Sequence, residues 1–74
     1  MNQPRRLDGT KIRRLREDLG LNVTQFAERV GIARQYLSYI ELGVKKRPSL
    51  TTLDAIAREL AVPLDDLLTA ENAA

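Results

Sequence analysis

Four polar side chains within six residues could hydrogen-bond to a planar partner such as a nucleic-acid base. They are Arg34, Gln35, Ser38 and Tyr39. An arginine guanidinium is suited to a two-bond contact with guanine, and a glutamine amide to one with adenine. On a helix that advances about 100° per residue, Gln35, Ser38 and Tyr39 point away from the apolar side marked by Leu37. The same residues would also suit the polar surface of any helix. Whether they contact a base therefore depends on the elements that surround them.

The stretch from Val23 to Gly43 has the spacing of two short helices that meet at a tight turn. Its apolar positions are Val23, Phe26, Val30, Ile32, Leu37 and Ile40. A small residue at Ala27 lets the second helix pack close to the first, and Gly31 supplies the positive φ that residues with a Cβ disfavour. Few other folds need both residues at this spacing, so the stretch predicts a helix-turn-helix.

With these residues the chain resembles the Cro and phage-repressor type of DNA-binding domain, often called the XRE family, from about Ile12 to Leu68. The resemblance implies an all-α, compact five-helix lambda-repressor-like domain in which helices two and three form the helix-turn-helix. It also implies that the helix at 34–42 enters the major groove of duplex DNA. Its base-reading positions are then Arg34, Gln35, Ser38 and Tyr39. The chain departs from the family at Val23, where a glutamine that contacts a phosphate is common.

The resemblance places phosphate contacts in two other segments. One is the start of the second helix, where free N–H groups and the helix dipole favour an anion; its residues are Asn22, Thr24 and Gln25. The other is the loop after the third helix, with Lys45, Lys46 and Arg47. Further arginines could add contacts at the flank or could simply be solvated charges, namely Arg5, Arg6, Arg13 and Arg14.

The resemblance also assigns residues that would hold the domain together or pair two copies of it. Glu41 lies near the inner side of the helix at 34–42, where an unpaired charge is costly. Similar phage repressors pair this glutamate with an arginine at the position of Arg16, so both are assigned to a structural ion pair. Family dimers commonly use the last helix. The resemblance therefore implies that Leu64, Leu67 and Leu68 form or support a two-fold interface. The alternative is that all three leucines pack inward.

Local signals predict helices at 11–19, from residue 23, at 34–42, from 49 to about 61, and at 64–69. The second helix has the most complete start, because Asn22 and Gln25 can form a capping box beside a hydrophobic staple of Leu21 and Phe26. Thr10 is predicted as the N-cap of the first helix, with Gly20 ending that helix.

Two alanines depart from the expected chemistry of helix ends. Ala33 stands where the family usually has a capping Ser or Thr, and losing such a cap typically costs about 1 kcal/mol. Ala61 stands where a glycine often follows the fourth helix, so that turn should be slightly strained or differently capped. We expect the domain to span 9–69, between a flexible basic arm at 1–8 and a flexible tail at 70–74.

Composition narrows the function classes. The chain has 74 residues, enough for one domain, and contains no cysteine and no histidine. The usual nucleophile, base and metal-ligand sets are therefore absent, and we expect neither an enzyme nor a cofactor. Asp65 and Asp66 are paired carboxylates with no pocket-forming context. No apolar stretch approaches a membrane span, which predicts a cytoplasmic protein.

Charge is divided unevenly along the chain. Residues 1–47 carry a net charge of +6 and residues 48–74 carry −4, within a total of +2. Such polarity suits a domain that turns one side toward a phosphate backbone, although uneven surface charge alone is common.

These observations predict a sequence-specific, duplex-DNA-binding transcriptional regulator, repressor-like and dimeric on a palindromic operator. The main rival is a protein-binding module, such as an antitoxin or adaptor with the same fold and an unknown protein partner. A single-domain enzyme is disfavoured for the reasons given above.

Overall fold

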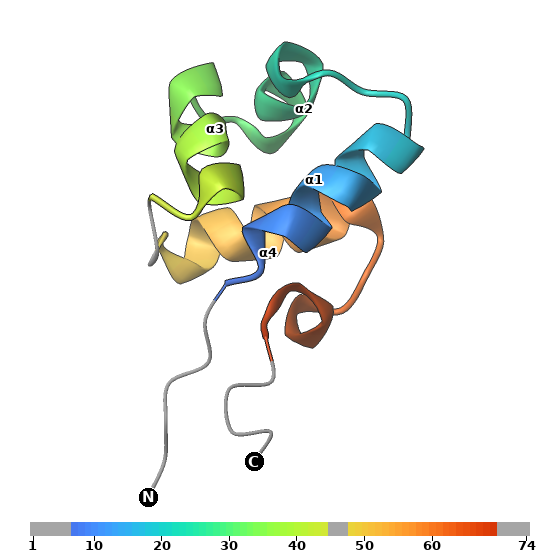
Figure 1. Ribbon diagram of the computed structural model, residues 1–74, viewed down its shortest axis with the longest axis vertical. Helices are drawn as coiled ribbons and strands as arrows, with labels where there is room; N and C mark the ends of the chain where they lie inside the picture. The colour runs from blue at the N-terminus through green and yellow to red at the C-terminus, as the bar shows by residue number, and fades with distance from the viewer. Residues whose placement is uncertain (1–6, 45–47, 70–74) are drawn as a thin grey trace, which may run out of the picture.

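Four α-helices followed by one short 3-10 helix make up the described part of the chain in this computed structural model, residues 7–44 and 48–69 (Figure 1). They are α1 (Gly9–Asp18), α2 (Val23–Val30), α3 (Arg34–Leu42), α4 (Leu50–Leu60) and the 3-10 helix η1 (Leu64–Leu67). The all-α class and the helix-turn-helix of α2 and α3 are confirmed. The fifth predicted helix is wrong in type and length, because Asp66 and Leu68 donate N–H bonds to carbonyls three residues back, the pattern of a 3-10 helix.

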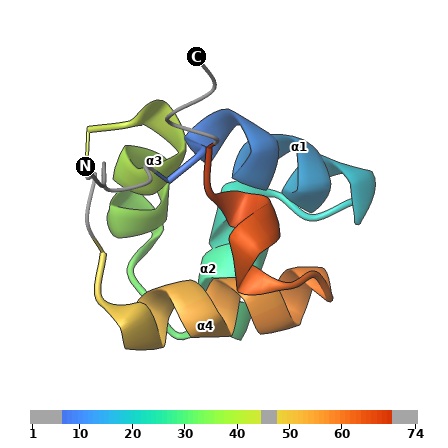
Figure 2. The same ribbon diagram turned by 90° about the horizontal axis from the view of Figure 1, so that it is seen from below.

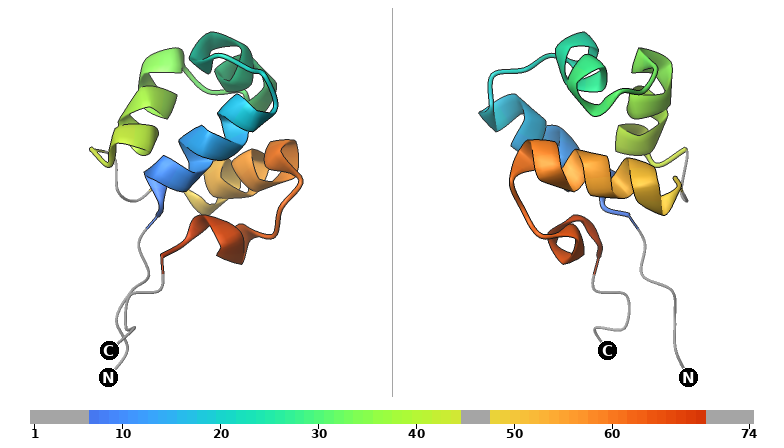
Figure 3. Two further views of the ribbon diagram at one scale, coloured as in Figure 1. Left: turned by 45° about the vertical axis from the view of Figure 1, so that its right-hand side comes forward. Right: turned by 180° about the vertical axis from the view of Figure 1, so that it is seen from behind.

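One apolar core joins all five elements. Its buried members are Ile12, Phe26, Ala27, Leu37, Ile40, Ile56, Ala57, Leu60 and Leu67. Viewed from below, α1 and α4 lie on opposite sides of the molecule, with η1 between them and α3 to one side (Figure 2). From behind, α4 crosses between the α2–α3 pair and η1 (Figure 3), and it packs against both α2 and η1. None of the helices within residues 7–44 and 48–69 has the length and apolar character needed to cross a membrane.

The turn between α2 and α3 has the predicted geometry. Gly31 adopts a φ of 89° and donates its N–H to the carbonyl of Ala27 at 2.8 Å. Ile32 donates to the same carbonyl at 3.0 Å, so the chain reverses within two residues. Ala27 is 2% exposed, as a small residue between two closely packed helices should be.

The N-terminal ends of the helices agree with the sequence at α2 and differ at α1. At α2 the capping box is present, with Gln25 N–H donating to Asn22 Oδ1 at 2.8 Å and Asn22 N–H donating to Gln25 Oε1 at 2.9 Å. Thr10 as the cap of the first helix is wrong, because α1 begins at Gly9 and Asp8 accepts the N–H of Lys11 at 3.1 Å. At α4, the side chain of Ser49 caps a helix that starts one residue later than predicted.

The first described residues belong to the folded unit. Leu7 forms an isolated antiparallel bridge with Leu68, and Asp8 donates its N–H to the carbonyl of Leu67 at 2.8 Å. The folded unit therefore includes Leu7 and Asp8, which had been predicted to belong to a flexible arm. The remainder of that arm, and the tail at 70–74, lie outside the described residues.

Gly9 sits at a close approach of α1 to α3 that the sequence did not reveal. It is buried, and a Cβ built at this position would lie 2.8 Å from the carbonyl carbon of Glu41 and closer still to two carbonyl oxygens of α3. Only a residue without a side chain fits there unless the helices move apart.

The proposed leucine interface of the last helix is wrong for Leu67, which is 0% exposed and part of the core. Side chains three residues apart eclipse one another on a 3-10 helix, so Leu64 points the same way and packs against the core as a partly buried residue. Leu68 is half-buried at the bridge to Leu7. The alternative prediction, that the leucines pack inward, is therefore correct for Leu67 and largely correct for Leu64.

Candidate nucleic-acid interface

Helix α3 separates its side chains into a buried face and an outer face. Leu37 and Ile40 are buried, which fixes the rotation of the helix. Arg34 and Gln35 are exposed near the N-terminus of α3, and Tyr39 is 40% exposed one turn later. Periodicity predicted that Gln35 and Tyr39 face outward, and both are exposed.

Ser38 lies apart from the other three predicted base-reading residues. It is half-buried and lines a cavity between α1 and α3. Ser38 therefore lies at the side of α3 that faces the cavity, and not at the centre of the outer face.

Gln35 and Tyr39 are joined by a hydrogen bond along the outer face. The Nε2 group of Gln35 donates to the hydroxyl oxygen of Tyr39 at 2.7 Å. The residues are four apart, the separation at which side chains on a helix surface meet. Their spacing permits this contact, which helical periodicity alone does not predict.

The start of α2 presents polar groups beside α3. Asn22, Thr24 and Gln25 are exposed, and the side-chain oxygens of Asn22 and Gln25 are engaged in the capping box. The nitrogen ends of both amides remain as donors. At the first positions of a helix, the backbone N–H groups have no intrahelical partner, so this end of α2 can receive an anion.

Arg16 and Glu41, which the sequence paired, form a buried two-bond ion pair between α1 and α3. Nε of Arg16 donates to one carboxylate oxygen of Glu41 at 2.8 Å and Nη2 to the other at 3.0 Å, while Nη1 donates to the carbonyl of Leu21 at 2.8 Å. The two side chains are only 7% and 6% exposed. The hydrogen bond to Glu41 raises the pKa of Arg16 despite the opposing effect of burial. The pair links α1 to α3 and is buried, so neither side chain is available to contact DNA.

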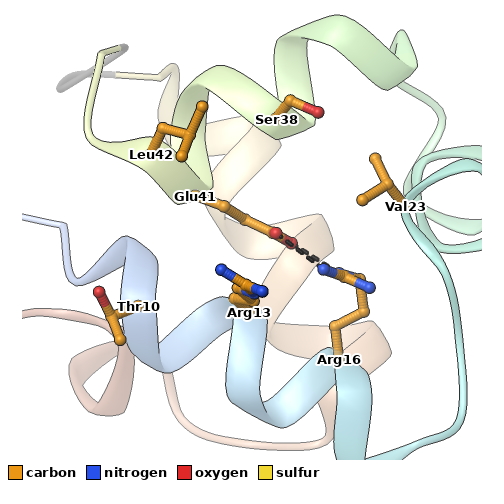
Figure 4. A pocket seen from close by; sticks show the side chains of 7 residues that line it. All are labelled: Thr10, Arg13, Arg16, Val23, Ser38, Glu41 and Leu42. Atoms are coloured by element: carbon orange, nitrogen blue, oxygen red, sulfur yellow. Dashed lines mark hydrogen bonds and ion pairs between the residues drawn. The ribbon is translucent and has the colours of Figure 1, made fainter.

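An open cavity of about 410 Å³ lies where α1, α3 and the start of α2 meet (Figure 4). Its lining consists of Thr10, Arg13, Arg16, Val23, Ser38, Glu41 and Leu42. Arg13 pairs with Glu17 at 3.1 Å on the exposed side of α1, with 60% of its side chain accessible. Val23, which replaces the glutamine common in the family, offers only an aliphatic side chain to this cavity.

Several predicted phosphate contacts lie outside the described residues. They are Lys45, Lys46 and Arg47, together with the flanking Arg5 and Arg6. The loop that holds the first three runs between Val44 and Pro48, in the connection from α3 to α4. Within the described ranges no group of three or more Asp and Glu side chains is placed to hold a metal ion.

Comparison with known proteins finds similarity to helix-turn-helix regulators and repressors. A family model described as helix-turn-helix matches residues 12–67. The HTH-type transcriptional regulator SinR of Bacillus licheniformis is 31% identical over 64 residues, which cover 86% of this chain and 58% of SinR. The immunity repressor protein of Bacillus phage phi105 is 33% identical over 64 residues, which cover 86% of this chain and 44% of the repressor. The chain thus spans about half the length of these curated relatives.

Solved structures agree with that result. The P22 c2 repressor protein in complex with a synthetic operator matches with a TM-score of 0.80 at 27% identity, covering 85% of this chain and 94% of the repressor chain. SinR, described as the master regulator for biofilm formation, in complex with DNA matches with a TM-score of 0.75 at 32% identity, covering 80% and 94%. A complex of SinR with the SinI protein matches with a TM-score of 0.79 at 31% identity, covering 86% and 62%.

Proposed function

The chain belongs to the helix-turn-helix family, and from that premise we propose that it is a sequence-specific, duplex-DNA-binding transcriptional regulator of the repressor type. The observation that carries the proposal is the outer face of α3, where Arg34 and Gln35 are exposed beside each other at the N-terminal end. In a helix-turn-helix, that end of the recognition helix contacts base edges in the major groove. Members of the family are transcriptional regulators, and the proposal includes no enzymatic step and no cofactor.

Within this proposal the base-reading residues are Arg34, Gln35, Ser38 and Tyr39. Arg34 has the fork of donors that suits guanine, and Gln35 has the donor and acceptor that suit adenine. The half-buried position of Ser38 limits it to a base or phosphate at the edge of the contact.

The proposed phosphate contacts come before and after the recognition helix in the sequence. Asn22, Thr24 and Gln25 lie at the start of α2, where N–H groups favour an anion. Lys45, Lys46 and Arg47 follow α3 in the sequence and would add affinity irrespective of the bases. This set replaces the glutamine contact that Val23 cannot make.

We further propose that two copies bind a palindromic operator, with their α3 helices about 34 Å apart, one turn of DNA. Because Leu67 is in the core, a contact through the last segment would have to use Leu68 and the remaining exposed part of Leu64. Such a regulator would act in the cytoplasm, where it meets its DNA.

Selection of bound sequences from a random duplex pool tests the proposal. We expect an enriched inverted repeat. Gln35→Ala should then weaken binding to the selected site by about 1–3 kcal/mol and binding to a scrambled duplex much less. Thr51→Ala, an exposed change on α4, serves as the control and should alter neither. A pool without enrichment would refute DNA reading, and sedimentation that shows only monomer on the selected duplex would refute the paired arrangement.

A protein-binding role is the second candidate, favoured by one observation. A structure similar to this chain is a complex of SinR with another protein, SinI. An adaptor or antitoxin of this fold would show little salt-sensitive DNA binding and no enriched sequence, so the same selection separates the two functions.

A further inference from the structure

The contact between Gln35 and Tyr39 links two side chains that would otherwise be independent on the outer face of α3. The donor–acceptor distance of 2.7 Å is at the short end for an N–H to oxygen bond. Within the described residues, the Gln35 side chain makes no other hydrogen bond. Val23, at the adjoining start of α2, is aliphatic and cannot supply one.

We propose that Tyr39 is a positioning residue, which holds the amide of Gln35 in place to read adenine. The inference rests on the proposed function and assigns Tyr39 a role other than base contact. A glutamine amide has two N–H donors and an oxygen with two lone pairs. The phenol oxygen of Tyr39 takes one N–H, which leaves the second N–H and all of Oε1. Those two groups match the N7 acceptor and the N6 amino donor of adenine.

The contact would act on the recognition of adenine because it places the amide before DNA arrives. A phenol hydroxyl can both donate and accept, so pairing with adenine selects the order in which Nε2 faces Tyr39. The hydrogen bond fixes where the amide lies on the outer face of α3. It also restricts a long side chain in the free protein, so less rotamer freedom is lost on binding.

The first test uses the free protein. Tyr39→Phe removes the hydroxyl and keeps the ring, and a thermal melt checks that the fold is retained. We expect the side-chain amide resonances of Gln35 to shift and to report greater mobility by NMR. The amide of Gln25, which is held in the capping box of α2, is the internal control and should not change. Unchanged Gln35 resonances would overturn the inference.

The second test uses the duplex enriched by the selection and its adenine at the position where Gln35→Ala loses preference. Replacing that adenine with 7-deazaadenine removes the N7 acceptor. The wild type should lose affinity about two- to tenfold, the range for one hydrogen bond, and Gln35→Ala should lose none. In Tyr39→Phe the penalty should fall to about half of its wild-type value or less on a logarithmic scale.

The outcomes separate this inference from the function on which it rests. An enriched site with a full 7-deazaadenine penalty in Tyr39→Phe would overturn the positioning role alone. An equal loss of affinity by Tyr39→Phe on every duplex would show that Tyr39 contacts the DNA directly, and would also overturn it. A pool without any enriched sequence would remove the proposed function and this inference together.

Discussion

Arg16 directs its guanidinium into the fold, although the domain is proposed to bind a polyanion. Three of its nitrogens donate hydrogen bonds, two to Glu41 and one to the carbonyl of Leu21. Because the pKa of Arg16 is raised, the group stays charged throughout the range below the unfolded-state pKa of arginine. Loss of the Arg16 charge therefore removes the stabilising effect only in strong base. The residue thus joins α1 to α3 at any ordinary pH.

Removing either member of this pair should leave the other charge buried. We expect Arg16→Ala or Glu41→Ala to lower the free energy of unfolding by about 3 kcal/mol, and the double replacement by apolar residues to be milder. Urea titration measures the effect. Arg13→Ala is the matched control, because its pair with Glu17 is exposed and should contribute less than about 1 kcal/mol. Equal unfolding midpoints for Arg16→Ala and Arg13→Ala would contradict the argument.

Gly9 provides a test in which two simple rules disagree in sign. Helix propensity alone predicts that Gly9→Ala stabilises α1, by less than the ~0.5–1 kcal/mol of a helix interior because Gly9 is the first residue of the helix. The backbone of α3 occupies the space of the new Cβ, and forcing atoms into a packed site typically costs about 1–3 kcal/mol. We expect net destabilisation in a thermal melt. Thr10→Ala, on the same turn but exposed, should show no such loss, and a Gly9→Ala variant as stable as wild type would disprove the close approach.

At the scale of elements, the end of α4 carries the one positive φ outside glycine among the described residues, 59° at Ala61. An L-residue in the left-handed region is strained by roughly 1–2 kcal/mol, and glycine is not. Replacing Ala61 with glycine would relieve this strain, but part of the gain in stability is offset by the greater freedom of glycine in the unfolded chain.

Ala61→Gly should therefore raise the free energy of unfolding, by about 0.5–1 kcal/mol. The same substitution at Ala55, inside α4, should lower it by about 1 kcal/mol. Differential scanning calorimetry of both variants checks the sign. Two shifts in the same direction would show that the backbone at Ala61 is not strained.

Elements were predictable where their signals are local. The capping box of Asn22 and Gln25 and the glycine at Gly31 need only neighbours in sequence, and both have the expected geometry. The start of α1 was missed because Asp8 and Thr10 are both able to cap a helix. In the structure Asp8 is the cap, and its N–H also bonds to the carbonyl of Leu67, a residue distant in sequence.

The candidate site shows the same division. Helical periodicity was enough to place Gln35 and Tyr39 on the outer face of α3. It could not place Ser38 at the cavity beside α1, because that depends on where another helix passes. Nor could it give the hydrogen bond between Gln35 and Tyr39, which depends on the rotamers of both side chains.

At the scale of the whole molecule, charge follows the fold. The basic segment 1–47 includes α1, α2 and α3, and the acidic segment 48–74 includes α4 and η1. Figure 1 shows the α2–α3 pair at one end of the molecule and η1 at the other. The proposed DNA face therefore belongs to the basic segment.

Neutralising one cation in each segment should separate a phosphate contact from a general charge effect. Lys46→Ala should reduce the magnitude of the log K against log salt slope by about one on any duplex, because each phosphate contact releases a counterion. Arg58→Ala removes the same charge from α4, where Arg58 pairs with Asp54, and should leave the slope unchanged. Fluorescence anisotropy at several salt concentrations measures both. Equal slope changes would mean that only net charge matters.

The bridge from Leu7 to Leu68 has a mechanical consequence. Because the pairing is antiparallel, a pulling force transmitted through these two residues would load their contacts one after another, as in peeling, rather than all at once in shear. The bridge would open first, together with its bond from Asp8 to Leu67, followed by the close contact of Gly9 with α3. Under tension, the molecule should therefore yield at a low force from the end that holds η1, with the turn between α2 and α3 among the last parts to open.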